Sequence, residues 1–293
     1  MLFFRKVAMI KKNLDDQIVD VINEFIGEKR NTPQIKATFP NALLRNDVLN
    51  LLDIYCTVIY FPLPNERNNG FHITGIVDKN GEEKHFVYIN THQTIEKQVF
   101  TAAHELGHVW KVDEYVASKC NNLQEDMSED IINRFAAELL MPREQFISAF
   151  ESEYQKIGAS EGGVSLSQAM QMILALMLLF FVPHKAVVYR LYELGKITER
   201  AFKVLIGEDA ISEEAINKYL EHLLRETKQD SFLIPTNRKW IDGLSELLAT
   251  AEEKHSVSKE KINNLRSLFD LPCEENVDET FEKMMDIPIK KED

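Results

Sequence analysis

The sequence predicts an α+β fold, in which a small, largely antiparallel three-stranded sheet packs with helices and precedes an all-helical C-terminal region. Segments rich in β-branched and aromatic residues lie between residues 56 and 90, separated by turn residues. From Thr94 onward, apolar residues recur with the spacing of amphipathic helices. These two patterns follow one another along the chain, which favours a sheet and helices segregated in sequence.

The region before Thr94 contains two expected helices and three expected strands. Apolar residues within 1–30 follow one helical face, and Gly27 is expected to end this helix. A second helix is expected over 43–54. The strands are expected at 56–61, 71–77 and 85–90, and residues 78–81 have the composition of a turn between the last two.

The region after Thr94 is expected to be helical apart from short connections. Thr94 and Ser128 are the expected N-caps of two helices, the second ending near Pro142. A polar connection over 113–127 separates them, and a short helix follows to residue 157. Further helices are expected at 165–181 and 185–194. The glycine-rich stretch 158–163 is the clearest linker, so we divide the chain into residues 1–158, 164–205 and 206–293.

Composition and charge favour a globular cytoplasmic protein. The formal net charge of −13 argues against a whole-chain preference for nucleic acid or an anionic membrane. The three cysteines are far apart and form no C-x-x-C pair, which is typical of reduced thiols. The N-terminus lacks the apolar run of a signal peptide, and the apolar run 172–182 is too short to span a bilayer. We therefore expect no membrane partner.

The most informative stretch is the motif HELGH at residues 104–108. Residues four apart share one face of a helix, so His104 and His108 can bind one metal ion. Glu105 then lies beside the metal, where its carboxylate can deprotonate a bound water without acting as a ligand. Gly107 lowers helix stability, and its missing side chain would let another segment approach closely.

A catalytic zinc ion needs a third protein ligand, and several carboxylates follow the motif. Glu129 and Glu138 are nine residues apart and point to opposite sides of a helix, so at most one of them can ligate. Glu129 is favoured because Asn133 lies one turn further on, where its amide could hydrogen-bond a metal-bound histidine. Glu138 is expected to be a surface glutamate. The carboxylates considered are Asp113, Glu114, Glu125, Glu129 and Glu138.

These residues resemble the ImmA/IrrE family of zinc metallopeptidases. The likeness rests on HELGH preceded by Phe100-Thr-Ala-Ala, on the strand Val87-Tyr-Ile-Asn90, and on Glu129-x-x-x-Asn133 followed by the run to Pro142. It covers residues 45–155 and continues more weakly through 181–195. In the family the glutamate four before the asparagine is the third ligand, which implies Glu129. The position two before the asparagine is often acidic or glutamine in members, whereas here it is Ile131.

The resemblance implies an intracellular regulatory protease of a mobile element or phage, since several members cleave a helix-turn-helix repressor to release transcription. We expect zinc held by His104, His108 and Glu129, with Glu105 as the catalytic base, and such a site also accepts manganese or cobalt. An oxyanion donor is expected as well. The candidates for it are His72, His85, His92, Tyr88 and Tyr115.

An alternative is a metal-stabilised regulatory protein that engages a repressor or DNA without proteolysis. Two helices joined by a short turn within 164–205 permit a helix-turn-helix interpretation. An αα-hairpin packed on the peptidase domain is favoured over it, because the basic residues are few. Those basic residues are Lys185, Arg190, Lys196, Arg200 and Lys203. The histidines His184, His222 and His255 are expected to lie at the surface or in turns.

Overall fold

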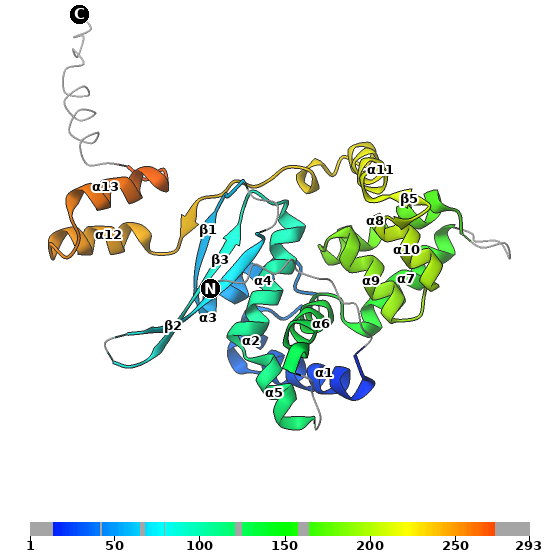
Figure 1. The fold of residues 1–293 in the computed structure, drawn as a ribbon, viewed down its shortest axis with the longest axis horizontal. Coiled ribbons are helices and arrows are strands. Elements are labelled where there is room, and N and C mark those ends of the chain that lie inside the picture. Colours follow the sequence, from blue (N-terminus) through cyan, green and yellow to red (C-terminus); the bar gives the residue numbers. More distant parts are fainter. Residues whose placement is uncertain are drawn as a thin grey trace, which may run out of the picture. The chain divides into compact units, whose positions relative to one another are not determined.

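The protein is mostly helical, with a small mixed sheet near the N-terminus and a helical C-terminal region, so it belongs to the α+β class (Figure 1). The structure, a computed structural model, describes residues 14–41, 43–64, 68–78, 80–120, 125–157 and 164–272. It divides into two compact units, Met1–Asn237 and Arg238–Asp293. The predicted linker 158–163 lies outside the described residues.

The sheet is mixed, not largely antiparallel. Strands β1 (Thr57–Phe61), β2 (Gly70–Val77) and β3 (Glu83–Asn90) lie in the order β2-β3-β1. The predicted hairpin of β2 and β3 is present, but β1 pairs with β3 in parallel. The sheet also has four strands where three were predicted. The fourth, β6 (Trp240–Ile241), was missed because it is only two residues long and carries no alternating pattern.

The parallel pairing of β1 with β3 could not be predicted from the pattern of either strand. Alternation of apolar residues shows which face of a strand is buried, but it does not show which strand lies beside it. β3 lies between β2 and β1, and its last four residues are all buried. The turn before it follows the expected chemistry, with the Asp78 side chain accepting hydrogen bonds from the amides of Asn80 and Glu82.

Along the chain, the first unit has helices before and after the strands of the sheet, and several of them differ from the expectations. Helix α1 passes through Gly27 and ends four residues later at an Asn31 cap. Helices α2 and α5 were not predicted, and α5 occupies part of the expected polar connection. Ser128 is the first residue of α6 and donates to Asp113 instead of capping the helix. The helices are α1 (Asp16–Arg30), α2 (Pro33–Thr38), α3 (Asp47–Tyr55), α4 (Ile95–Val109), α5 (Val112–Lys119), α6 (Ser128–Leu140) and α7 (Arg143–Ile157).

Later helices complete the first unit and form the second. Ser165 caps α8 through a capping box with Gln168, which satisfies amides that the first turn leaves without partners. The remaining helices of the first unit are α8 (Leu166–Phe180), α9 (His184–Glu193), α10 (Glu199–Ile206) and α11 (Glu213–Glu226). The second unit contains α12 (Leu244–Glu253) and α13 (Lys259–Leu268), whose residues Leu248 and Ile262 are buried.

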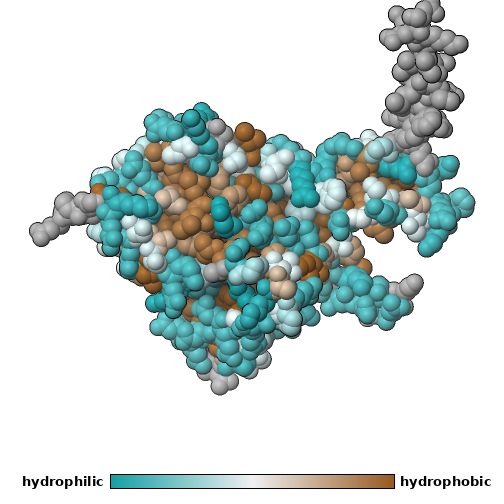
Figure 2. All heavy atoms as spheres, turned by 180° about the vertical axis from the view of Figure 1, so that it is seen from behind, coloured by the Kyte–Doolittle hydropathy of each residue, from teal (hydrophilic) through white to brown (hydrophobic). Residues whose placement is uncertain are grey.

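The apolar run in α8 is a core segment. Its residues Met172, Ile173, Leu176 and Phe180 are buried against other parts of the protein. Among the described helices, none alone has the length and apolar composition of a membrane span; only α8 and α9 taken together would, and they are bent by 103°. In a space-filling view from behind, hydrophobic side chains are visible among a largely polar surface (Figure 2).

Helix α4 lies at the centre of the first unit, between the sheet and α6 (Figure 1). It contacts β2 and β3 on one side and α6 on the other, and α6 in turn packs against α1. Gly107 allows the close approach of α4 and α6. A Cβ atom on Gly107 would lie 2.9 Å from Cδ1 of Phe135 and 3.2 Å from Cγ2 of Ile132. The sequence-based expectation that another segment approaches Gly107 is therefore confirmed.

This contact predicts opposite effects for alanine at two helical glycines. Gly107→Ala should lower the free energy of unfolding by about 1–3 kcal/mol, because the added methyl group meets the Phe135 ring and overpacks the core. Gly27→Ala is the matched control, since nothing lies within 4 Å of the added carbon, and it should stabilise by up to about 1 kcal/mol. Urea unfolding of both variants measures the difference, and equal stabilisation would contradict the packing described.

Candidate metal centre

Helix α4 brings two imidazoles together at its border with α6. His104 is 6% exposed, and its Nε2 lies 3.2 Å from Nε2 of His108. On its other side, Nδ1 of His104 lies 3.0 Å from the amide oxygen of Asn133 in α6. With this amide orientation Nδ1 carries the proton and donates to Asn133, so Nε2 keeps a free lone pair. The amide thus holds His104 in the tautomer that a metal at Nε2 requires.

Helix α6 supplies a carboxylate to the same point. Oε2 of Glu129 lies 3.5 Å from Nε2 of His104, and Oε1 lies 3.7 Å from Nε2 of His108. One ligand atom from each of the three residues lies within 4.8 Å of the others. Among the described residues, no other group of three His, Cys, Asp or Glu side chains meets this criterion.

The spacing of these atoms fits a zinc ion. Zinc binds nitrogen and carboxylate oxygen at about 2.0–2.2 Å, so in a tetrahedral site two ligand atoms lie about 3.3–3.5 Å apart. The two imidazole nitrogens are 3.2 Å apart, and one Glu129 oxygen lies 3.5 Å from His104 and the other 3.7 Å from His108, all close to that range. Half of the Glu129 side chain remains exposed, with a relative exposure of 51%, so the site is open to solvent on this side. The arrangement therefore suits three protein ligands and an open fourth position.

The other carboxylates considered from the sequence are placed elsewhere. Asp113 accepts a hydrogen bond from the Ser128 hydroxyl, and Glu114 is exposed on α5. The side chain of Glu125 is not among the described ones. Glu138 is only 3% exposed, so the prediction of a surface glutamate is wrong. The structure brings Glu129 alone of these five beside the two histidines within the described part of the chain.

Glu138 is buried because it pairs with an arginine from α9. Nη1 and Nη2 of Arg190 donate to the two carboxylate oxygens of Glu138 at 2.6 and 2.5 Å, and Nη2 also donates to the carbonyl of Met141. Such a two-point contact is the strong geometry for a guanidinium and a carboxylate. The pair was missed because its partners are 52 residues apart in sequence. It fixes α9 against the helix that carries Glu129.

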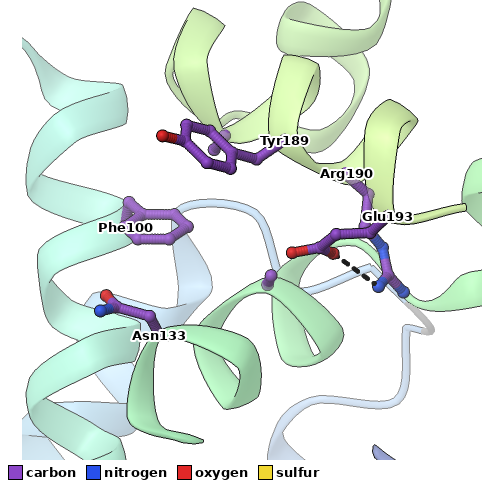
Figure 3. A pocket seen from close by; sticks show the side chains of 7 residues that line it. Phe100, Asn133, Tyr189, Arg190 and Glu193 are labelled. Carbon is purple, nitrogen blue, oxygen red and sulfur yellow. Dashed lines mark hydrogen bonds and ion pairs between the residues drawn. The ribbon is translucent and has the colours of Figure 1, made fainter. Parts of the chain in front are cut away.

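A second ion pair extends this buried cluster. Glu193 of α9 accepts from Nη1 of Arg134 at 2.8 Å and from Nη1 of Arg190 at 3.4 Å. Figure 3 shows Arg190 and Glu193 reaching from α9 toward α6, with Tyr189 and Phe100 on the other side of a small cavity. Asn133, the hydrogen-bond partner of His104, lines the same cavity. One face of α6 therefore carries Glu129 and Asn133, and another carries Arg134 and Glu138 of the buried cluster.

Burial controls the protonation of the groups at the centre. It lowers the pKa of His104 to about 3, with a smaller contribution from His108, so His104 is neutral and able to act as a ligand at neutral pH. Burial also raises the pKa of Glu105 to about 8, and the Glu129 carboxylate adds to this effect. A metal dication bound nearby favours the ionised form of Glu105, because its positive charge opposes the effects of burial and of the Glu129 carboxylate.

Gly70 lets the edge strand β2 pass close to Glu105. A Cβ on Gly70 would lie 2.5 Å from the Thr101 side chain and 3.5 Å from Oε1 of Glu105. A side chain here would therefore collide with α4 beside the expected base. Sequence analysis did not single out Gly70, although a glycine at the start of a predicted strand is a signal for close backbone approach.

The candidate oxyanion donors are dispersed. Tyr88 donates to the carbonyl of Phe61, and Tyr115 donates to Glu28 on α1. The rings of His72 and His85 lie against each other on β2 and β3, with Nε2 and Nδ1 3.0 Å apart. Burial lowers the pKa of His72 to about 4, and the nearby His85 and His108 contribute further. None of these contacts selects one of these side chains as the oxyanion donor, so the presence of such a donor stays a prediction.

A cleft of about 680 Å³ opens onto His104 and Glu105. His92 lines it, and so does His184 at the start of α9. His184 is 7% exposed and is the first residue of α9, so the expectation of a surface or turn position is wrong, whereas His222 and His255 are exposed as expected. Burial lowers the pKa of His184 to about 4. The position after Pro183 gives no periodic signal of burial, and only the fold shows it.

Comparison with known proteins agrees with the geometry of the centre. Residues 53–192 match the family described as the IrrE N-terminal-like domain, Peptidase_M78. This segment belongs to the Peptidase_M78 family. Membership suggests a metallopeptidase. Within this IrrE N-terminal-like domain lie His104, Glu105, His108 and Glu129, while α10 and α11 follow its last matched residue.

More distant comparisons give no closer assignment. No protein in a search of curated sequences matches the chain. A solved structure of a Mycobacterium tuberculosis transcriptional regulator is similar at 13% sequence identity, with a TM-score of 0.36. The similarity covers 60% of this chain and 52% of the regulator, so the chain spans about half the length of that protein.

The centre predicts which carboxylate controls metal affinity. Glu129→Gln should weaken zinc binding by more than the roughly 10–100-fold cost of losing an outer hydrogen-bond partner, because it removes a charged ligand. Asn133→Ala should fall within that range, because it frees His104 Nδ1 from its amide partner. Competition with a chromophoric zinc chelator measures these affinities.

Glu114→Gln is the matched control for this measurement. It makes the same chemical change at an exposed position on α5, and it should leave zinc affinity unchanged. Weaker zinc binding in Glu114→Gln together with unchanged binding in Glu129→Gln would show that the third ligand has been assigned to the wrong helix.

Proposed function

We propose that this protein is a zinc-dependent, site-specific endopeptidase. The observation that carries the proposal is the meeting of His104, His108 and Glu129 at zinc-ligand spacing, with the buried carboxyl group of Glu105 on the same turn of α4. Three protein ligands with an open fourth position are the pattern of catalytic zinc sites, whereas structural zinc sites use four protein ligands. Membership of the Peptidase_M78 family supports the same chemistry.

When bound, zinc supplies Lewis-acid polarisation of a peptide carbonyl and a water of lowered pKa. Asn133 orients His104 by accepting its Nδ1 proton, and Glu129 adds negative charge from α6. Glu105 accepts the proton of the attacking water and delivers it to the leaving amine. The burial of Glu105 supports this role, because a carboxylate that is poorly solvated holds a proton more strongly.

The proposed substrate is a regulatory protein, such as a helix-turn-helix repressor, cleaved in the cytoplasm. Support for it comes from the resemblance to ImmA/IrrE peptidases, several of which act on such repressors. Mapping new N-termini after co-expression with repressors encoded beside its gene identifies the substrate and the scissile bond together.

The alternative of direct DNA binding by residues 164–205 has less support. Four of the five basic residues of that segment have carboxylate partners: Lys185 pairs with Glu213, Arg190 with Glu138, Lys196 with Glu151 and Lys203 with Glu199. Arg190 is buried, and so are five other residues of α9. A recognition helix needs a free face with cations for phosphate contact, so this arrangement favours helices packed on the peptidase domain.

The proposal predicts that Glu105→Gln separates metal binding from catalysis. The variant should keep stoichiometric zinc and lose cleavage by about 10²–10⁴-fold, because only the proton acceptor has been removed. Glu114→Gln is again the control and should cleave at the normal rate. Zinc content and the rate of product formation are measured on the same samples.

Two results would argue against the peptidase. Undiminished cleavage by Glu105→Gln would remove the proposed base. An intact partner held in a stable complex by both the original protein and Glu105→Gln would favour the alternative, a metal-stabilised binding protein.

A further inference from the structure

The cleft in front of the candidate metal centre has a wall that the family match does not include. The match ends at residue 192, within α9, yet residues of α11 and of the segment after it line the cleft that reaches His104 and Glu105. Its volume of about 680 Å³ lies within the range of about 300–1,000 Å³ that is typical of ligand-binding clefts. The part of the chain to which no role has been assigned thus forms one side of the site.

Residues 213–237, which form this wall, are attached at two places to residues inside the family match. At the far end, the Asn237 amide donates to the carbonyl of Thr91 at 2.8 Å, and Nε2 of Gln98 donates to the Thr236 hydroxyl at 2.9 Å. At the near end, Lys185 at the start of α9 pairs with Glu213 in the first turn of α11 at 2.5 Å. Both ends are therefore held by contacts to residues inside the family match.

Apolar side chains form part of the inner surface of the wall. Met177 of α8, Leu220 and Leu224 of α11, and Phe232 line the cleft, and we call these four residues the apolar wall. Phe232 packs against Phe181 with ring centroids 4.8 Å apart, which keeps it in place. Each residue of the apolar wall is at least nine-tenths buried, so only a small part of each surface faces the cleft.

The charged residues of the cleft surround the apolar wall but do not belong to it. Lys185 pairs with Glu213, and the other charged residues of the lining are Lys97, Glu96, Glu105 and Glu221. A substrate side chain that covers the apolar wall therefore gains by burying apolar surface. Because the cleft continues to His104 and Glu105, one extended peptide can cover the apolar wall and also reach these two residues.

We infer that the apolar wall is a specificity subsite, which accepts a large aliphatic or aromatic side chain of a polypeptide close to the bond presented to the metal centre. The inference rests on the proposed peptidase function and adds the kind of substrate residue selected. Three of the four residues of the apolar wall belong to residues 213–237, which follow the family match, and Met177 lies inside it.

Peptide binding tests the subsite without relying on turnover. The probes are two fluorescein-labelled decapeptides of glycine and serine that differ only in a central leucine or alanine. Zinc-loaded Glu105→Gln protein should bind the leucine peptide about tenfold more tightly, since each added methylene contributes to selectivity in an apolar pocket. Leu220→Ala in the same background should reduce this preference several-fold. Fluorescence anisotropy measures all affinities.

Two matched controls separate the subsite from general effects on folding. Leu223→Ala removes the same atoms from a buried leucine of α11 that does not line the cleft, and it should leave the peptide preference unchanged. Asn217→Trp on the exposed cleft side of α11 should block binding of the leucine peptide. Lys218→Trp, one residue further along and outside the lining, should not.

The outcomes distinguish the subsite from the peptidase itself. Equal binding of both peptides, absent binding, or equal effects of Leu220→Ala and Leu223→Ala would overturn the subsite. Selective binding without cleavage by the protein that retains Glu105 would support the subsite and contradict the proposed peptidase. Cleavage of both peptides at equal rates would contradict the subsite and support the peptidase.

Discussion

The close packing of α4 against α6 is the constraint on which the centre depends. Two histidines one turn apart on α4 provide only two ligands, and the third has to come from another element. At Gly107 the absence of a side chain allows Phe135 and Ile132 of α6 to approach α4. Ile132 and Phe135 flank Asn133 in α6, and both Asn133 and Glu129 contact His104. One glycine therefore determines whether a ligand and a hydrogen-bond partner reach the imidazoles.

Helix α6 serves two purposes on two faces. Glu129 and Asn133 face α4 and the candidate centre, while Arg134 and Glu138 pair with Glu193 and Arg190 of α9. Buried pairs of this kind add little net stability over apolar packing, but removing one partner is costly because the other charge stays buried. The cluster therefore specifies one position of α9 on α6. Through α9 it also sets the place of His184 and Lys185 at the cleft.

Much of the centre could be predicted from the sequence because its parts are local. The four-residue spacing of His104 and His108, the position of Glu105 between them, and the four-residue spacing of Glu129 and Asn133 all follow from helix geometry. The close approach at Gly107 and the contact between Asn133 and His104 were expected for the same reason, and both are present. Patterns within single helices were sufficient for these residues.

The features that were missed depend on contacts between distant segments. The parallel pairing of β1 with β3 involves strands separated by β2, and alternation within each strand does not encode it. Glu138 was taken for a surface residue because its partner Arg190 lies in another helix. His184 shares this problem, since it is buried in the fold although no periodic pattern in the sequence marks it. The apolar wall likewise appears only when the first unit is assembled.

X-ray absorption at the zinc edge tests the central claim most directly, because it identifies the atoms around the metal. The zinc-loaded full chain should hold one ion with nitrogen and oxygen neighbours at about 2.0–2.2 Å and the outer-shell scattering of two imidazoles. Replacing Glu129 should remove one oxygen neighbour and leave both imidazoles. Sulfur neighbours at about 2.3 Å, or zinc without imidazole scattering, would contradict the account.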